Sequence, residues 1–184
     1  MPITYRTLPV PAFDEFTLRI AAGVVTFGVE YRHLDEAVIL AHYGPDSRAR
    51  FDNVMPAGFT GTVEEDGLCV HVFGSEDGAE YLRFDCFDEA AHYHLMDPAA
   101  PRNVVVEHDV AVRGPLLPWA IEAMQTRLPE LLREAGAKTL ADRIDPRAVT
   151  AALERVREES ARMQAAGRPV RVAPPPEAGT ASPR

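Results

Sequence analysis

Residues 80–96, EYLRFDCFDEAAHYHLM, hold two short segments in which apolar and ionisable side chains alternate. Successive residues of a β-strand point to opposite faces, so this alternation predicts two strands joined by a turn at 88–90. One face of the predicted hairpin is apolar, and the other, the ionisable face, carries side chains that can act as acids, bases or metal ligands. The ionisable face carries Arg83 and Asp85 from the first strand and His92 and His94 from the second, with Tyr81 at its edge.

The turn length sets which residues of this hairpin oppose one another. A two-residue loop and a four-residue loop both predict the pairs Phe87–His92, Asp85–His94 and Arg83–Met96. Opposed residues have Cβ atoms about 4.5–5.5 Å apart, so we expect the Asp85 carboxylate to contact the His94 imidazole. Such a carboxylate fixes the tautomer of the imidazole and favours its charged form, as in a general base or a metal site.

A further strand, predicted over 68–74, joins the hairpin through a turn at 76–78. A three-residue loop with Gly78 in the left-handed conformation predicts the pairs Phe73–Tyr81, His71–Arg83 and Cys69–Asp85. This register adds His71 to the ionisable face. A two-residue turn at 77–78 would instead oppose Cys69 to Cys86 and move His71 to the apolar face. We favour the first register because it keeps the apolar side chains of the three strands together.

The rest of the chain places strands before helices. Residues 1–16 are predicted to form an extended entry segment. Two strands are predicted before the hairpins, over 17–22 and 24–31, and one after them, over 104–109, with 110–112 as a possible continuation. Gly28 interrupts the second of these, which predicts a bulge or a close backbone approach. A short helix is expected over 34–43, followed by a loop over 45–66.

Helical periodicity dominates after Gly114-Pro115. Helices are predicted from Leu117 to Gly136, where Pro129 either opens a further turn or kinks the helix, and from Asp145 to about Gln164. This order predicts an α+β fold, an antiparallel meander of about five to six strands packed by C-terminal helices. We expect one domain over 1–166 and a disordered Pro/Ala/Gly-rich tail over 167–184.

Composition excludes several classes of protein. The formal charge of −9, with Lys138 as the only lysine, disfavours a nucleic-acid surface. Two cysteines cannot form the disulfide framework of a small secreted protein. The first residues lack the pattern of a signal peptide, and no apolar run approaches the ~20 residues that cross a bilayer. We therefore expect a cytoplasmic protein without nucleic-acid or membrane partners.

The ionisable face admits three interpretations. His92 and His94, two residues apart on a strand, can bind one divalent metal ion, with His71 as third ligand and Asp85 or Glu107 behind it. A metal-free pocket for a small molecule would use His94 as acid or base, Asp85 to orient it and Arg83 as an anion clamp, with Tyr81 and His71 also contacting the substrate. The third interpretation is a solvated sheet face, which antiparallel sheets often have.

These interpretations lead to two hypotheses of function. The first is a small enzyme or small-molecule-binding protein whose catalytic residues are His94, Asp85 and Arg83. The second is a non-enzymatic module in which the same face forms a homodimer or a partner interface, although charged residues are usually depleted from interface centres.

The run Glu80–Asp85 and the triplet His92-Tyr93-His94, with ITYRTLPVPAFDEFTLRI at 3–20 and GVVTFGVEYR at 23–32, resemble a family of short, uncharacterised bacterial proteins. The resemblance spans about residues 3–160 and implies no activity. Ala90-Ala91 departs from the family pattern in the turn only. A more distant likeness, to toxin–antitoxin-associated proteins with an Arg-aromatic-Asp strand before a histidine-rich strand, is a minor alternative.

Overall fold

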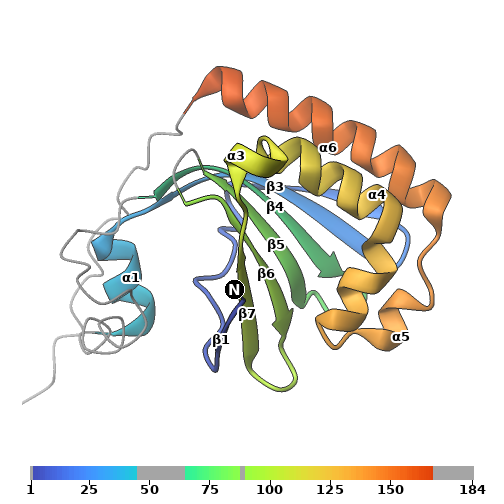
Figure 1. Ribbon diagram of the computed structural model, residues 1–184, viewed down its shortest axis with the longest axis horizontal. Helices are drawn as coiled ribbons and strands as arrows, with labels where there is room; N and C mark the ends of the chain where they lie inside the picture. The colour runs from blue at the N-terminus through green and yellow to red at the C-terminus, as the bar shows by residue number, and fades with distance from the viewer. Residues whose placement is uncertain (1, 45–64, 88–89, 168–184) are drawn as a thin grey trace, which may run out of the picture.

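The computed structural model describes residues 2–44, 65–87 and 90–167, and the structural statements below concern these residues. Their strands form one antiparallel sheet in the order β1-β7-β6-β5-β4-β3-β2 (Figure 1). The seven strands are β1 (Ile3–Tyr5), β2 (Thr17–Ala22), β3 (Val25–Leu34), β4 (Glu65–Gly74), β5 (Glu80–Phe87), β6 (His92–Asp97) and β7 (Arg102–Glu107). The predicted count was too low because part of the expected extended entry, Ile3–Tyr5, pairs with β7.

The two long helices, α4 (Leu116–Glu134) and α6 (Pro146–Ala166), cover one face of the sheet. The other helices of the described residues are α1 (Glu36–Tyr43), α3 (Val110–Arg113) and α5 (Lys138–Ala141), and α1 lies apart from α4 and α6 (Figure 1). Helix α6 packs across β2, β3 and β4, while α4 packs across β5 and β6 and against α6 (Figure 1). The predicted α+β class is therefore confirmed.

Local signals in the sequence set the helix ends. The Asp35 carboxylate accepts a hydrogen bond of 2.9 Å from the Val38 amide and caps α1, as Asp145 caps α6 through Arg147. The backbone of Arg127 leaves the helical region two residues before Pro129, so the predicted kink in α4 is confirmed. The predicted strand continuation at 110–112 is wrong, because the Asp109 side chain caps a short helix there.

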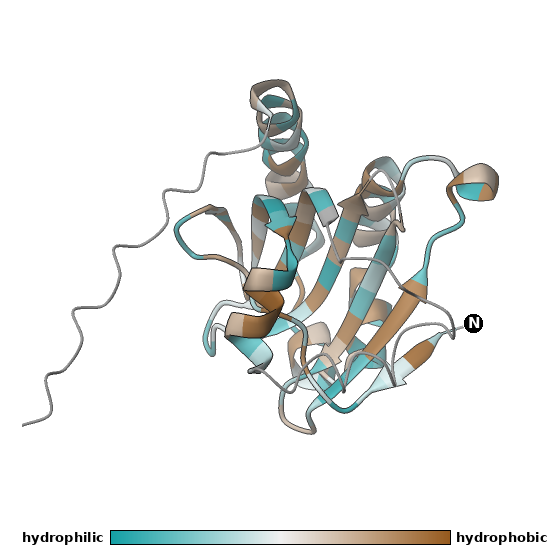
Figure 2. Ribbon diagram, turned by 90° about the vertical axis from the view of Figure 1, so that its left-hand side faces the viewer, coloured by the Kyte–Doolittle hydropathy of each residue, from teal (hydrophilic) through white to brown (hydrophobic). Residues whose placement is uncertain are grey.

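The helix-facing side of the sheet forms the core. Hydrophobic and hydrophilic residues alternate along the strands (Figure 2), and the apolar set faces α4 and α6. Fully buried members of this core include Phe27, Val70, Leu82 and Phe84 from the sheet and Met124, Leu128 and Val156 from the helices. Burying one such side chain stabilises the fold by roughly 1.5–3 kcal/mol.

The register of the first hairpin follows the favoured prediction with one correction. Cys69 opposes Asp85 and His71 opposes Arg83, as expected, and Gly78 has φ +67°. The predicted Phe73–Tyr81 pair is wrong, because an extra residue in β5 makes Phe73 oppose Glu80. This bulge turns the Glu80 side chain toward the ionisable face and leaves Tyr81 against the helix-side core.

The predicted register of the second hairpin is wrong by two residues. Asp85 opposes His92 and Arg83 opposes His94. The connection between the strands is longer than the predicted loops, so pairing begins at Asp85 instead of Phe87. A shift of two residues preserves the alternation of faces, which is why Asp85, His92 and His94 still share one side of the sheet.

The segment 6–16 is a strap that crosses the sheet. It leaves β1 at one edge and enters β2 at the opposite edge. The Val10 carbonyl accepts hydrogen bonds from Arg32 and Arg83, so the strap runs over the ionisable face, on the side away from α4 and α6. This crossing gives the sheet a second covered face.

Two of the predicted segments lie outside the described residues, namely the loop 45–66, apart from its last two residues, and the tail 167–184, apart from Gly167. Within the part of the chain that the structure describes, no helix combines the length and apolar character needed to span a membrane.

Gly28 of β3 lies where side chains of the two neighbouring strands, β2 and β4, pack closely against its backbone. A Cβ atom there would lie 2.8 Å from side-chain carbons of both Phe73 and Thr17, so the predicted close approach is confirmed without a bulge. We expect Gly28→Ala to lower the free energy of unfolding by about 1–3 kcal/mol in urea titrations. Ala21→Val, at an exposed position of β2, should change it by less than about 0.5 kcal/mol. Equal effects of the two variants would contradict this packing.

Candidate functional site

Most of the ionisable face is buried, and the strap covers the part around Arg32 and Arg83. His71 and Glu30 are 0% exposed, and Arg83, Asp85 and His94 are between 1% and 6% exposed. The interpretation of these residues as a wet sheet face is therefore wrong. A buried polar group must be hydrogen-bonded and a buried charge paired, so the partners of each residue reveal what the face is built to do.

A carboxylate and two imidazoles converge at the middle of this face. Asp85 Oδ2 lies 2.9 Å from His94 Nε2 and 3.3 Å from His92 Nε2. The three ligand atoms lie within 4.8 Å of one another, so Asp85, His92 and His94 form a possible metal-binding triad. The predicted Asp85–His94 contact thus occurs, although through a diagonal pair, because His92 is the residue directly opposite Asp85.

Both histidines of the triad have their second ring nitrogen fixed by an oxygen acceptor. His92 Nδ1 lies 2.7 Å from the Ala90 carbonyl oxygen, and His94 Nδ1 lies 2.8 Å from Asn103 Oδ1. Since these oxygens accept hydrogen bonds, each Nδ1 carries the hydrogen. A neutral imidazole in this tautomer presents the lone pair of Nε2, which is the atom that faces Asp85.

Charge in the triad is set by burial and by the imidazoles. Burial alone would raise the pKa of Asp85, but the contacts of its carboxylate with the His92 and His94 imidazoles outweigh burial and hold the pKa well below its usual value. Burial lowers the pKa of His94 more than Asp85 raises it, so the neutral imidazole is favoured. Asp85 thus favours the charged form of His94, as expected, but burial outweighs this effect.

The Cys69 thiol contacts the second oxygen of the Asp85 carboxylate. The thiol donates a hydrogen bond of 2.9 Å to Asp85 Oδ1 and leaves Oδ2 for the imidazoles. Burial, followed by the Asp85 charge, raises the pKa of Cys69 well above its usual value, so the thiol stays protonated and can act as this donor.

A second cluster, beside the triad, is a closed ion network. Arg83 donates from Nε to Glu80 Oε1 at 2.8 Å and from Nη2 to Glu80 Oε2 at 2.6 Å. His71 Nδ1 lies 2.6 Å from Glu80 Oε1, and its Nε2 lies 3.2 Å from Glu30 Oε2, an ion-pair contact without hydrogen-bond geometry. Every nitrogen of Arg83 has an acceptor, because Nη1 donates to Val10 O.

The network shifts the pKa values of its members in opposite directions. Burial works against the charged form of His71, but Glu80 and Glu30 outweigh it and raise the pKa. Burial also works against the Glu80 carboxylate, yet the charges of Arg83 and His71 outweigh it and lower the pKa. Histidine and carboxylate are thus both held in their charged forms.

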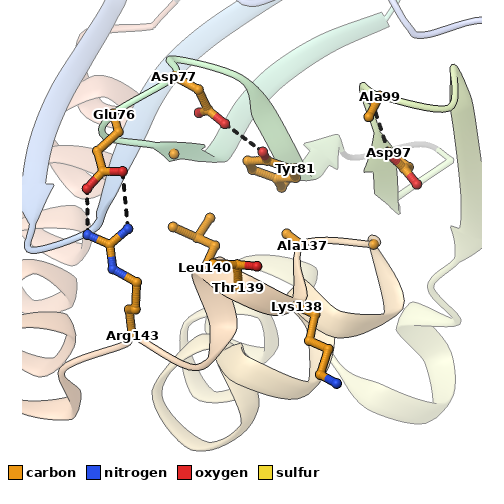
Figure 3. A pocket seen from close by; sticks show the side chains of 12 residues that line it. Glu76, Asp77, Tyr81, Asp97, Ala99, Ala137, Lys138, Thr139, Leu140 and Arg143 are labelled. Atoms are coloured by element: carbon orange, nitrogen blue, oxygen red, sulfur yellow. Dashed lines mark hydrogen bonds and ion pairs between the residues drawn. The ribbon is translucent and has the colours of Figure 1, made fainter.

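Tyr81 lies away from both clusters. It lines a hollow of about 300 Å³ between the strand turns and α5, together with Asp77, Asp97, Leu140 and Arg143 (Figure 3). Its hydroxyl donates to Asp77 Oδ2 at 2.7 Å, and burial, with Asp77, raises its pKa to about 12. The Glu76 and Arg143 side chains in this hollow pair with each other, so the hollow offers a ligand few uncommitted groups.

The structure brings together only part of the predicted site. Asp85, His92 and His94 meet, whereas His71 and Arg83 belong to the neighbouring network and Tyr81 to the other face. Glu107 lies opposite His92 on β7 but is not part of the triad of possible metal ligands. Sequence reasoning missed Glu30, Arg32 and Asn103. The alternation of Glu30 and Arg32 along β3 was the signal that could have found the first two.

The fold and this site define an α+β protein with a buried carboxylate–imidazole triad on its sheet. The chain belongs to the family described as "Domain of unknown function (DUF7700)", whose model matches residues 19–160. The resemblance to an uncharacterised family is confirmed to that extent, and the description names no activity. No curated protein and no solved structure matches the chain.

The raised pKa of His71 predicts how its contribution to stability depends on pH. A raised pKa in the folded state stabilises the fold fully below the unfolded value of about 6.5, and this contribution is lost as pH rises through the folded pKa. We therefore expect the penalty of His71→Gln, measured by urea unfolding, to shrink as the pH rises from about 6.5 through the folded pKa. A penalty for His71→Gln that grows with pH would contradict the charged network.

Proposed function

We propose that this protein binds one divalent transition-metal ion through Asp85 Oδ2, His92 Nε2 and His94 Nε2, and presents the ion to a small-molecule ligand. The observation that carries the proposal is the orientation of the two imidazoles. Their Nδ1 atoms are committed to Ala90 O and Asn103 Oδ1, so the Nε2 lone pairs point at a carboxylate oxygen. Lone pairs and an anionic oxygen repel one another unless a cation lies among them.

The spacing of the donor atoms fits a metal ion. Two ligand atoms that are each ~2.1 Å from a metal and subtend about 90–110° lie roughly 3.0–3.4 Å apart. The distance of 3.3 Å from Asp85 Oδ2 to His92 Nε2 falls in this range, and that of 2.9 Å to His94 Nε2 lies just below it. The hydrogen bonds from each Nδ1 and from Cys69 to Asp85 are the outer contacts that commonly orient metal ligands.

Two histidines and one carboxylate suit zinc or a non-haem metal such as iron(II), and they leave coordination positions for water or a ligand. A metal in such a position acts as a Lewis acid and activates water or polarises an oxygen of the ligand. In this proposal Asp85 and His94 act as ligands of the ion. They would contribute to catalysis by holding the metal, and not as an acid–base pair. Arg83 and His71 support the site from the neighbouring ion network.

The alternative of a homodimer or partner interface is less well supported on this face. Arg83, Asp85 and His94 are covered by their own chain, so they cannot supply the contact surface of a partner. An oligomer formed through another surface stays a prediction, as do the cytoplasmic location and the absence of nucleic-acid partners.

Metal content tests the proposal directly. Protein purified without a histidine tag should bind one equivalent of Zn²⁺ or Co²⁺, measured by calorimetry and by the visible absorption of bound Co²⁺. We expect His92→Ala, His94→Ala and Asp85→Asn each to weaken binding by at least ~100-fold, since each removes a ligand. His42→Ala, which removes an exposed histidine of α1, should bind as the unaltered protein does. Stoichiometric binding that survives His94→Ala would contradict the assignment.

Asn103 gives a sharper test of the imidazole orientation. Asn103→Leu removes the acceptor of His94 Nδ1, and we expect the affinity for Co²⁺ to fall about 10- to 100-fold. Asn103→Asp keeps an oxygen acceptor there and should retain tighter binding than the leucine variant. If Asn103→Asp bound the metal no better than Asn103→Leu, Asn103 would not be fixing the tautomer as an acceptor.

A further inference from the structure

Arg32 is a fully buried guanidinium without a counter-ion among the described residues. Its exposed fraction is 0%, and its polar partners are the carbonyl oxygens of Val10 and Pro11, at 2.7 and 2.9 Å, both bonded through Nη2. Nε and Nη1 have no hydrogen-bond partner. A guanidinium stays charged in proteins, and a buried charge without an opposite charge is costly.

Arg83, on the same face, is a buried guanidinium that does have a counter-ion. It is 1% exposed and is held by both oxygens of Glu80. Both arginines donate to one neutral atom, the Val10 carbonyl oxygen. Two positive groups therefore meet at one oxygen, and only one of them has a carboxylate.

The other carboxylates of this face have contacts elsewhere. Glu80 is taken by Arg83 and His71, and Asp85 by the imidazoles and Cys69. Glu30 Oε2 contacts His71 Nε2 and lies near the Phe13 amide and the Thr17 hydroxyl, while its Oε1 has no partner. Glu30 is therefore near Arg32 in sequence without pairing with it.

The surroundings of Arg32 strengthen its attraction for an anion. The Phe13 ring lies 5.0 Å from the guanidinium carbon, which excludes water from that side. Arg32 also lies within electrostatic reach of the triad: burial and Asp85 raise the pKa of Cys69, and Arg32 acts on it in the opposite direction. An anionic group at Arg32 would thus sit on the same face as the triad.

We infer that Arg32 binds an oxyanion, a carboxylate or phosphate group, of the small molecule that the metal site receives. The inference rests on the proposed function for the role of that molecule, and it replaces Arg83, whose nitrogens are all occupied, as the anion-binding arginine. Arg32 Nε and Nη1 would donate charge-assisted hydrogen bonds to the oxyanion. The strap carbonyls keep Nη2 in place.

The test uses metal-free protein, so that an anion cannot bind through the metal. Protein labelled with ¹⁵N-arginine is titrated with acetate or with inorganic phosphate at ionic strength held constant with sodium chloride. The Arg32 Nε–H resonance, assigned through bonds from its backbone amide, should shift and saturate. The Arg83 Nε–H, which already donates to Glu80, should stay unchanged. The two salts distinguish a carboxylate ligand from a phosphate ligand.

Variants give the second readout. Arg32→Lys keeps the charge but loses the planar donor set, and we expect it to bind the preferred anion at least about tenfold more weakly, which is about 1.4 kcal/mol. The control is Arg19→Lys, at a partly exposed arginine paired with Asp14, which should bind as the unaltered protein does. No saturable shift at Arg32, or equal affinity in Arg32→Lys, would overturn the inference. Co²⁺ binding is measured separately, so loss of the anion site leaves the metal proposal standing.

Discussion

The crossing of the sheet by the strap at 6–16 is the constraint on which the rest of the ionisable face depends. Because β1 and β2 lie at opposite edges, the chain between them must pass over the full width of the sheet. It passes on the side without α4 and α6, and two arginines bind its Val10 carbonyl. A face that would otherwise be wet becomes an interior, where charges must be paired and hydrogen bonds are electrostatically stronger.

Burial of this kind is an inefficient way to stabilise a fold. Replacing buried ion pairs by apolar residues of similar volume is often neutral or stabilising. The helix-facing core already supplies a continuous apolar layer, so the hydrophobic core is complete without the ion network and the triad. The two clusters differ in their contacts. Glu80 and Glu30 pair with Arg83 and His71, while in the triad both Nε2 atoms face Asp85 Oδ2.

Alternation in the sequence predicted most of the side chains that share the ionisable face, namely His71, Arg83, Asp85, His92 and His94. It gave the opposition of Cys69 to Asp85 and of His71 to Arg83, because a wrong register would have split the apolar set. It could not give the bulge that moves Tyr81 to the other face, since Glu80 turns inward through contacts with Arg83 and His71. A two-residue slip leaves alternation intact, so the pairing of Asp85 with His92 was also hidden. The burial of Glu30 and Arg32 depends on the strap, and therefore on the distant pairing of β1 with β7.

Crystals of metal-loaded protein, measured at the absorption edge of the metal, test most directly whether Asp85, His92 and His94 bind one metal ion, as we propose. We expect a single anomalous peak ~2.0–2.2 Å from Asp85 Oδ2 and from Nε2 of both histidines, with each Nδ1 still facing its oxygen acceptor. No peak at that point, with both Nε2 atoms donating hydrogens to Asp85, would contradict the proposal.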